Sequence, residues 1–274
     1  MKIAVTGGKG GTGKSTVATA LAVELSKYGN VLLVDADVDC PNDHLLLDME
    51  RKEVSEVETM IPEFNERKCK KCGRCSEVCK ENAIVQVQDK YPILSEDQCT
   101  GCRACMFACP FDAISPSKQT IGKIYESEGI VDMVSGEMDA GVEESSLVVN
   151  ALKKHVEKKS GYDYVVVDTA AGTHCPVISA LVDVDLGIAV TEPTPLGEHD
   201  LNLILELMDK LEVESKVVVN RSDIADNTGV KEVSERWKVP VIAMIPYSKD
   251  IERDYAQGKP IKHKSIEKMV GVVG

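Results

Sequence analysis

A double run of cysteines in the middle of the chain is its most specific chemical pattern. Eight of the ten cysteines in this 274-residue protein fall within residues 69–79 and 99–109, each run spaced C-x2-C-x2-C-x3-C. Thiolates at this spacing are metal ligands, and three of them separated by two residues can wrap around one iron–sulfur cube. Zinc is the competing metal for C-x2-C pairs. Disulfides fit poorly, because nothing else suggests a small secreted protein.

A glycine-rich segment near the N-terminus has the chemistry of a phosphate-binding loop. Residues 8–15 read GKGGTGKS, which fits G-x-x-x-x-G-K-[ST]. Glycines let backbone N–H groups turn toward phosphates, Lys14 can bridge the β- and γ-phosphates, and the Ser15 hydroxyl can bind Mg²⁺. The pattern predicts a nucleoside triphosphate site, against the alternative of a plain glycine-rich turn.

Carboxylates follow two of the apolar runs of the chain. Asp37 lies at the end of residues 31–37, and Asp168 near the end of residues 164–169. Ligands of open α/β sheets bind at the carboxyl ends of strands, so these acids can meet a phosphate, its attacking water or a water of Mg²⁺. Asp35 is expected to be a supporting residue or part of the Mg²⁺ shell, whereas Asp39 and Asp43 read as solvated loop charges. A simple turn-capping role for Asp168 is the alternative.

The elements that must hold these groups are apolar runs separated by helical patterns. Residues 2–6 lead into the loop, and residues 15–28 have helical spacing before Gly29. Further continuous apolar runs lie at 31–37, 164–169, 186–193, 216–222 and 239–246, and helical patterns lie at 198–211 and 230–237. Such strands are buried on both faces, so we expect an α/β fold with a mostly parallel sheet flanked by helices.

The cysteine segment interrupts this alternation and repeats itself. Residues 69–84 match residues 99–114 at an offset of 30, cysteines and the following Ala-Ile included. We therefore predict a discontinuous P-loop domain at 1–61 and 119–274, with an inserted two-half module at 62–118.

The net charge and the hydropathy of the chain indicate which kinds of binding partner to expect. The net charge of −13 argues against a nucleic-acid surface, because such surfaces neutralise phosphates with Lys and Arg. The sequence has no apolar run of the ~20 residues needed to cross a bilayer and no secretory signal. We expect a cytoplasmic protein with protein and small-molecule partners.

The loop contains a lysine in addition to Lys14, namely Lys9. With it, residues 8–15 resemble the deviant Walker A signature of the MinD, ParA, Mrp and nitrogenase iron-protein superfamily. The resemblance implies a P-loop ATPase that works as a homodimer, with Lys9 reaching the partner's nucleotide. It also implies that Asp37 belongs to switch I and orients water, and that Gly172 belongs to switch II. Asn220, which follows an apolar run, would read adenine, although asparagine there is often only a turn former.

The residues expected at the nucleotide divide into two overlapping groups. Those expected in catalysis are Lys9, Lys14 and Asp37. Those expected to bind the nucleotide are Gly8, Lys9, Gly10, Gly11, Thr12, Gly13, Lys14, Ser15, Thr16, Asp168, Gly172 and Asn220, with Ser15 also on Mg²⁺.

The cysteine module resembles the bacterial two-cluster ferredoxins, in which the fourth cysteine of each run ligates the other cube. The implied sets are Cys69, Cys72, Cys75 and Cys109 for one [4Fe–4S] cluster, and Cys99, Cys102, Cys105 and Cys79 for the second. The first run departs from the pattern, because Lys80 stands where Pro110 follows the second run. The lysines and Arg74 around the first run are solvated charges, charges that offset the cluster, or a docking site for an acidic partner.

Two cysteines and the C-terminal segment remain. Cys175 lies near the place of a dimer-bridging cluster ligand in the nitrogenase iron protein, and Cys40 is the only other spare cysteine. A small buried apolar role is the favoured interpretation for both, with a dimer-interface thiol or a transient cluster ligand as the alternatives. Residues 261–274 are short and glycine-interrupted, unlike the membrane-targeting helix of MinD, so we expect no stable membrane association.

Together these patterns predict an ATP-binding and ATP-hydrolysing iron–sulfur protein with ATP, Mg²⁺ and two [4Fe–4S] clusters as cofactors. The first hypothesis is that the nucleotide switch is coupled to electron transfer with a protein redox partner. The alternatives are an ATP-dependent iron–sulfur or metal-cofactor assembly carrier, and a non-catalytic nucleotide-dependent redox adaptor.

Overall fold

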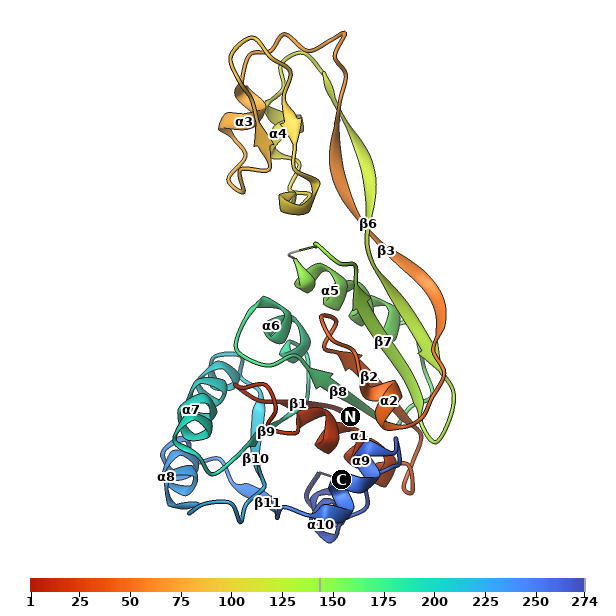
Figure 1. Ribbon diagram of the computed structural model, residues 1–274, viewed down its shortest axis with the longest axis vertical. Coiled ribbons are helices and arrows are strands. Elements are labelled where there is room, and N and C mark those ends of the chain that lie inside the picture. The colour runs from red at the N-terminus through yellow and green to blue at the C-terminus, as the bar shows by residue number, and fades with distance from the viewer. Residues whose placement is uncertain (143, 274) are drawn as a thin grey trace.

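The computed structural model describes residues 1–142 and 144–273 (Figure 1). Its central strands are β1 (Lys2–Thr6), β2 (Val31–Ala36), β7 (Asp132–Met138), β8 (Tyr164–Thr169), β9 (Leu186–Thr191), β10 (Glu214–Asn220) and β11 (Val241–Ile245). They lie in the order β11-β10-β9-β1-β8-β2-β7, and all of these neighbours are parallel. The expected mostly parallel sheet is confirmed, and each of the apolar runs forms one of its strands.

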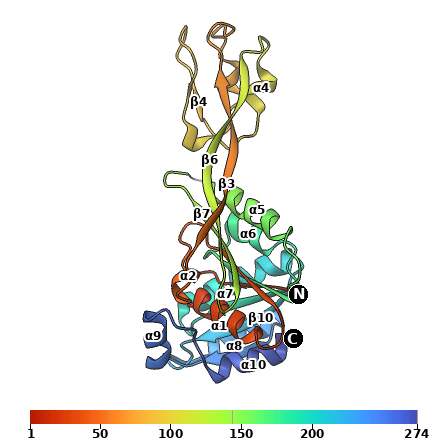
Figure 2. The same ribbon diagram turned by 90° about the vertical axis from the view of Figure 1, so that its right-hand side faces the viewer.

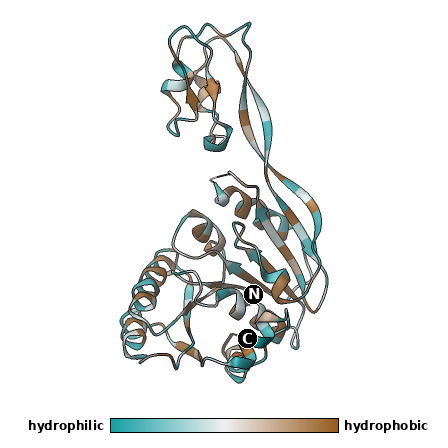
Figure 3. Cartoon of the chain, viewed as in Figure 1, coloured by the Kyte–Doolittle hydropathy of each residue, from teal (hydrophilic) through white to brown (hydrophobic). Residues whose placement is uncertain are grey.

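Helices cover both faces of this sheet. One face packs against α1 (Lys14–Leu25) and α10 (Lys264–Val273). The other packs against α5 (Ser145–Val156), α6 (Cys175–Leu181), α7 (Pro195–Lys210) and α8 (Thr228–Trp237). Alternate residues of β1 enter the two cores, Ile3 and Val5 on one side and Ala4 on the other. Figure 3 shows the hydrophobic residues concentrated on these strands and on parts of the helices.

The C-terminal segment is part of the first core. Helix α9 (Lys249–Ala256) precedes α10, whose residues Ile266, Met269, Val270 and Val273 are buried against α1 and β11. The amphipathic character of this segment therefore serves packing within the domain. In the described part of the chain, no helix combines the length and apolarity required to span a bilayer.

A long antiparallel ribbon leaves the edge of the sheet. Strand β3 (Lys52–Phe64) pairs with β6 (Ile114–Ser127), and β6 pairs with β7 at the sheet edge. Figures 1 and 2 show this ribbon carrying a small module away from the rest of the chain. Ion pairs Lys118–Glu58 and Lys123–Glu53 cross it at 2.5 and 2.8 Å. The boundaries expected at 61/62 and 118/119 fall inside these two strands.

The module at the end of the ribbon consists of two equivalent halves. It contains α3 (Arg74–Glu77), β4 (Ile84–Val85), β5 (Ile93–Leu94), the 3₁₀ turn Glu96–Gln98 and α4 (Ala104–Ala108). Positive φ angles recur at the offset of 30 residues, in the pairs Lys71 and Gly101, Gly73 and Arg103, and Asn82 and Asp112. The same offset relates two backbone bonds, Asn65 N to Ala113 O (2.8 Å) and Ser95 N to Ala83 O (2.7 Å). The sequence repeat is therefore also a structural repeat.

Candidate nucleotide site and cysteine module

The glycine-rich loop connects β1 to α1, which the sequence pattern requires of a phosphate-binding loop. Gly13 has φ of 91°, and a Cβ at this position would lie 2.3 Å from Asn220 Nδ2. A side chain would therefore meet both backbone strain and a steric clash there. Lys14 is buried, and its Nζ donates to Lys9 O at 3.2 Å. Burial lowers the pKa of Lys14, whereas the nearby carboxylate of Asp168 opposes that shift.

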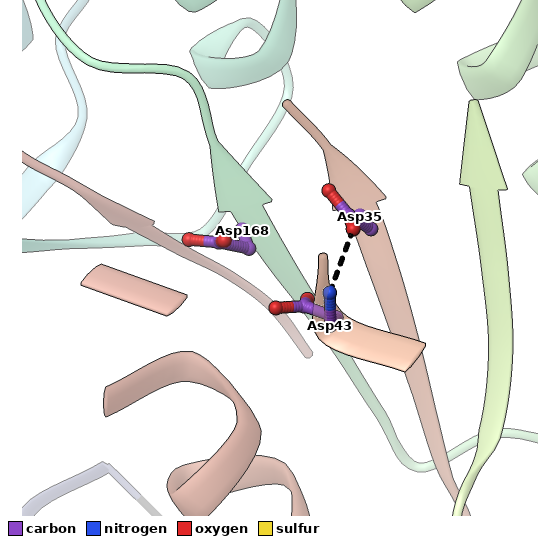
Figure 4. Close-up of side chains that lie close together, drawn as sticks. All are labelled: Asp35, Asp43 and Asp168. Carbon is purple, nitrogen blue, oxygen red and sulfur yellow. Dashed lines mark hydrogen bonds between the residues drawn. The ribbon is translucent and has the colours of Figure 1, made fainter. Parts of the chain in front are cut away.

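Three buried carboxylates gather beside this loop at the carboxyl ends of β2 and β8 (Figure 4). The ligand oxygens of Asp35, Asp43 and Asp168 lie within 4.8 Å of one another. Ser15 Oγ donates to Asp168 Oδ2 at 2.6 Å. Asp35 accepts backbone N–H groups from Asp43 at 3.1 Å and from two other residues of the turn after β2, Asp37 (3.2 Å) and Asn42 (2.9 Å).

Desolvation dominates the electrostatics of this group. Burial raises the pKa of Asp35 to about 7. Burial, and then the charge of Asp35, raise the pKa of Asp168 and of Asp43 well above the ordinary value. Three buried carboxylates repel one another and attract any cation that can reach them.

The position of Asp43 corrects the expectation that it is a solvated loop charge. It is the first residue of α2 (Asp43–Leu46), and its exposed fraction is 0%. The turn after β2 folds back so that α2 begins beneath the end of the strand, held there by the backbone bonds to Asp35. The sequence carries no signal for this reversal, because the polar run DVDCPND is equally typical of an exposed loop.

A pocket of about 470 Å³ opens over the loop. Asp37, Lys14 and Ser15 line its phosphate end, and Asn220 lines it farther along the sheet. Its lining also includes three polar residues of the segment beyond β10, namely Arg221, Tyr247 and Tyr255. Arg221 pairs with the buried Glu192 at 2.5 Å, and Tyr247 donates its hydroxyl to Glu252 at 2.6 Å. Tyr247 and Tyr255 lie within residues 245–261, whose sequence resembles the base-side loop and helix of Mrp and MinD relatives, whereas no motif indicates Arg221.

The other expected nucleotide residues lie around this pocket in different ways. Among the pocket-lining residues are also Gly10, Gly11, Gly13 and Thr16. Gly8, Lys9, Thr12, Asp168 and Gly172 lie behind or beside it, outside its lining. Gly172 has φ of 98°, and its N–H donates to Gly7 O at 3.0 Å. Asn220 Nδ2 donates to Thr12 O at 2.8 Å, so this amide holds the loop in addition to facing the pocket.

Cys40 and Cys175 differ from the expectation of small buried apolar residues. Both thiols are exposed, Cys40 in the turn after β2 and Cys175 as the first residue of α6. Each follows the end of a central strand, and neither belongs to the buried hydrophobic clusters of the described residues.

The eight repeat cysteines divide four and four between two small pockets of the module. The first is lined by Cys69, Cys72, Cys75 and Cys109. The second is lined by Cys79, Cys99, Cys102 and Cys105. Each pocket thus brings together three cysteines of one run and the fourth of the other. Backbone N–H groups of Lys71 and Ala113 donate to Cys69 Sγ and Cys109 Sγ, both at 3.4 Å.

The buried thiols of this module have the chemistry of metal ligands. Burial raises the pKa of Cys75 and Cys99, and it raises the pKa of Cys105 to about 11. A buried thiolate is costly unless a metal or another cation neutralises it. Four soft sulfur donors in each pocket fit thiolate-binding metals, including iron–sulfur clusters.

The fold and the phosphate loop together define a P-loop nucleotide-binding α/β domain. More specifically, the chain belongs to the CobQ/CobB/MinD/ParA nucleotide-binding domain family, which matches residues 3–261. The nucleotide-binding class expected from the sequence is thereby confirmed.

Relatives and solved structures agree with this assignment. An uncharacterized protein of Methanocaldococcus jannaschii is 37% identical over 94% of this chain and 90% of its own. An iron-sulfur cluster carrier protein of Pyrococcus abyssi is 23% identical over 89% of this chain and 73% of its own. The Pyrococcus horikoshii MinD complexed with Mg-ADP has a similar fold, with a TM-score of 0.61 and 20% identity over 99% of this chain and 95% of that one.

Proposed function

We propose that this protein is an ATP-hydrolysing nucleotide switch that carries two [4Fe–4S] clusters and couples ATP to electron transfer through them. One observation carries the proposal: eight cysteines sort four and four into two pockets, on a module whose supporting strand β6 is also a strand of the nucleotide-domain sheet. The nucleotide and cysteine sites are thus parts of one hydrogen-bonded framework.

The number and repeat of the cysteines favour iron–sulfur cubes over zinc. Each pocket combines three cysteines of one C-x2-C-x2-C-x3-C run with the fourth of the other. This is the ligand arrangement of bacterial two-cluster ferredoxins.

We expect the residues around the nucleotide to have distinct roles in binding and hydrolysis. Lys14 would neutralise charge on the β- and γ-phosphates, and Ser15 with Asp168 would hold Mg²⁺, which stabilises the charge of the transferred phosphoryl group. Asp37 lines the phosphate end of the pocket, from which it can orient the attacking water. In a homodimer, Lys9 would complete the site of the partner, while its carbonyl keeps Lys14 in place.

A short chain of contacts connects this site to the ribbon. Val38, next to Asp37, accepts the backbone N–H of Met138 at 2.9 Å. Met138 in turn pairs with Gly122 of β6, the ribbon strand that leads to the module. Gly136 lets β7 approach closely, since a Cβ there would lie 2.8 Å from Val38 Cγ1. A shift of Asp37 upon phosphate binding would therefore act on β6 through two neighbouring contacts.

A second set of contacts connects the nucleotide site to the ribbon through helices α6 and α5. Helix α6 begins three residues after Gly172, and Lys153 of α5 donates to Ser179 O of α6 at 2.8 Å. His155 of the same helix α5 lies 2.6 Å from Glu126 of β6. The segments of Asp37 and Gly172, the two expected switches, are thus connected to the base of the ribbon through intervening elements, β7 for the first and α6 with α5 for the second.

A face of the module suits a protein partner. In the hairpin of residues 84–94, Gln86 and Pro92 line the first cysteine pocket. The alternate residues Val85, Val87 and Ile93 face outward, 56, 63 and 70% exposed. Strand alternation therefore puts an apolar patch one residue away from the first cluster pocket.

The charge around this hairpin indicates the kind of partner. Residues 65–91 contain seven Lys and Arg against four Asp and Glu, although the whole chain carries −13. Lys71 stacks on the Tyr91 ring at 4.5 Å, and Lys90 precedes Tyr91. An apolar centre with a basic rim fits a redox protein with acidic residues around its own centre.

A second candidate function is an ATP-dependent iron–sulfur carrier, and the observation that favours it is the similarity to the P. abyssi carrier protein. In that case a cluster, rather than an electron, would leave the module. The exposed faces of both cysteine pockets are compatible with either process.

Anaerobic purification tests the proposal directly. Iron and sulfide analysis should give about eight of each per chain, with the paramagnetic resonance of reduced [4Fe–4S] clusters. Addition of Mg-ATP should then change the rate at which reduced clusters deliver electrons to an acceptor. Zinc in place of iron would contradict the cluster assignment. Intact transfer of clusters to an apo-protein, with no effect of ATP on electron delivery, would favour the carrier function.

A further inference from the structure

We infer that Asp43 completes a divalent-cation site with Asp35 and Asp168, and that this site binds its cation before the nucleotide arrives. The inference deepens the nucleotide half of the proposed function and does not depend on the clusters. Figure 4 shows the three side chains side by side where β2 and β8 end and α2 begins.

The hydrogen-bond inventory of the three carboxylates identifies Asp43 as the unusual member. The backbone bonds of the turn after β2 occupy both oxygens of Asp35, and Ser15 occupies Oδ2 of Asp168. Both oxygens of Asp43 and Oδ1 of Asp168 are buried without any partner. A fully buried carboxylate with no hydrogen bond is rare, because its desolvation is not compensated.

The carboxylates around this site outnumber the basic groups that interact with them. Lys14 is the basic group that interacts with Asp168, and it also interacts with Asp37. One ammonium therefore faces a set of carboxylates that includes the buried Asp35 and Asp43. A divalent ion would neutralise two of these charges where a side chain neutralises one.

The donor set defines the class of ion. Three carboxylates with no nitrogen or sulfur donor among them suit hard cations such as Mg²⁺ and Mn²⁺. The ligand oxygens already lie within 4.8 Å of one another, so binding requires little rearrangement. Phosphate is not needed to complete this set, which is why we expect binding without nucleotide.

The role of Asp43 differs from that expected of Ser15. Ser15 meets the cation at the phosphate side of the pocket, whereas Asp43 is absent from the pocket lining and lies behind it. Asp43 is thus a positioning residue that retains the ion at the strand ends, from which it can be presented to incoming phosphates. The order of binding would then be cation first and nucleotide second.

Titration of the nucleotide-free protein with Mn²⁺, followed by the resonance of free Mn²⁺, tests this inference. The wild-type chain should bind one Mn²⁺ without nucleotide, and Asp43→Asn should bind it at least tenfold more weakly. Asp39→Asn is the matched control, because Asp39 is exposed in the same turn and should bind Mn²⁺ like the wild type. Mg²⁺ should also raise the unfolding temperature of the wild type and of Asp39→Asn, but not of Asp43→Asn.

The outcomes separate this inference from the proposed function. Absence of nucleotide-free Mn²⁺ binding in the wild type, or equal binding by Asp43→Asn and Asp39→Asn, would overturn it. The wild type could still bind Mg-ATP in that case, and the proposed nucleotide switch would stand. Circular dichroism verifies the fold of Asp43→Asn. If that variant does not fold, Asp168→Asn replaces it, with the same loss expected.

Discussion

Ser15 Oγ lies 2.6 Å from Asp168 Oδ2, although 153 residues separate the two in the chain. This hydrogen bond joins the first turn of α1 to the end of β8, directly beneath the phosphate loop. Because β1 pairs with β8 along its length, the loop and the carboxylate are held by adjacent strands. The two groups expected at Mg²⁺ are therefore in direct contact.

Loss of the Ser15 hydroxyl should uncouple nucleotide binding from magnesium. In Ser15→Ala, Asp168 loses its hydrogen bond and Mg²⁺ loses an oxygen ligand, so we expect the affinity for Mg-ATP to fall at least tenfold. Affinity for ATP in the presence of a chelator should change much less. Equilibrium titration with a fluorescent ATP analogue measures both. Ser26→Ala, at the other end of the same helix, provides the control and should behave as the wild type.

Asn220 has two expected roles, holding the phosphate loop and binding adenine, and a comparison of ATP with GTP binding distinguishes them. Its amide donates to Thr12 O at 2.8 Å and also faces the pocket. We expect Asn220→Ala to weaken ATP binding about tenfold, as the loss of a positioned hydrogen bond to a buried group implies. GTP binding should weaken less, because only adenine is expected to use the amide. Equal losses for ATP and GTP, measured by calorimetry, would mean that Asn220 only holds the loop.

The parts of the fold that follow from local pattern were predictable from the sequence. Strands such as Val31–Ala36 and Leu186–Thr191 are apolar throughout because both of their faces are buried. The phosphate loop is recognisable because its glycines and lysine must stand at fixed spacing. The sorting of cysteines into two sets came from a resemblance, and its chemical consequence stays a prediction.

The parts that depend on distant partners were not predictable. Strand β3 reads KEVSEVETMIPEF, in which charged and apolar residues are mixed without a clean alternation, and its pairing with β6 makes it a strand. Its acids face basic residues such as Lys118 that lie 60 residues away in the chain. Asp43 is buried because backbone groups of its own turn bind Asp35, and such a reversal leaves no periodic signal.

Removal of one cysteine from each set should affect different clusters. We expect Cys109→Ala to disturb the cluster of Cys69, Cys72 and Cys75, and Cys79→Ala the other, because each set loses one of its four ligands. Each variant should lose between about one and four of about eight irons per chain. Iron analysis and the resonance spectra of the reduced proteins measure these losses, which should alter different components of the wild-type spectrum.

Cys175→Ala is the matched control for these variants, since its thiol is exposed and outside both pockets. It should keep all of the iron of the wild type. Identical spectral changes in Cys79→Ala and Cys109→Ala would contradict the division of the cysteines into two sets. Loss of iron in Cys175→Ala would instead indicate a third iron site at the start of α6.

Charge reversal beside the hairpin should slow reduction by an acidic partner. The double variant Lys71→Glu, Lys90→Glu reverses the basic rim next to the outward-facing Val87 and Ile93. With a reduced, strongly acidic ferredoxin as donor, we expect about a tenfold slower reduction of the clusters at low salt, because steering by charge is lost. Stopped-flow absorbance at several salt concentrations should show the difference shrinking as salt rises.

A second double variant controls for net charge. Lys154→Glu, Lys158→Glu makes the same change of charge on exposed residues at and just after the C-terminal end of α5, outside the module. It should reduce the rate much less than the hairpin variant does. Iron content must match the wild type in both. Equal rates for the two variants would exclude the hairpin face as the docking site while leaving the clusters in place.

The contact between α5 and the ribbon should have a characteristic dependence on pH. Glu126 of β6 lies 2.6 Å from His155 and 2.7 Å from Lys159. Burial alone would raise the pKa of Glu126, but hydrogen bonds from Lys159 and His155 lower it below the ordinary 4.5. A carboxyl whose pKa is lower in the folded state stabilises the fold above its unfolded-state pKa, and this contribution disappears as pH falls through the folded value.

We therefore expect Glu126→Gln to cost about 1 kcal/mol at pH 7, as partly exposed ion pairs do. Thermal unfolding at pH 7 and pH 4 should show the deficit shrinking at the lower pH. Glu58→Gln, which breaks the more exposed pair with Lys118 midway along the ribbon, should cost less at pH 7. A deficit in Glu126→Gln that stays constant with pH would show that packing, and not the charged contact, attaches α5 to the ribbon.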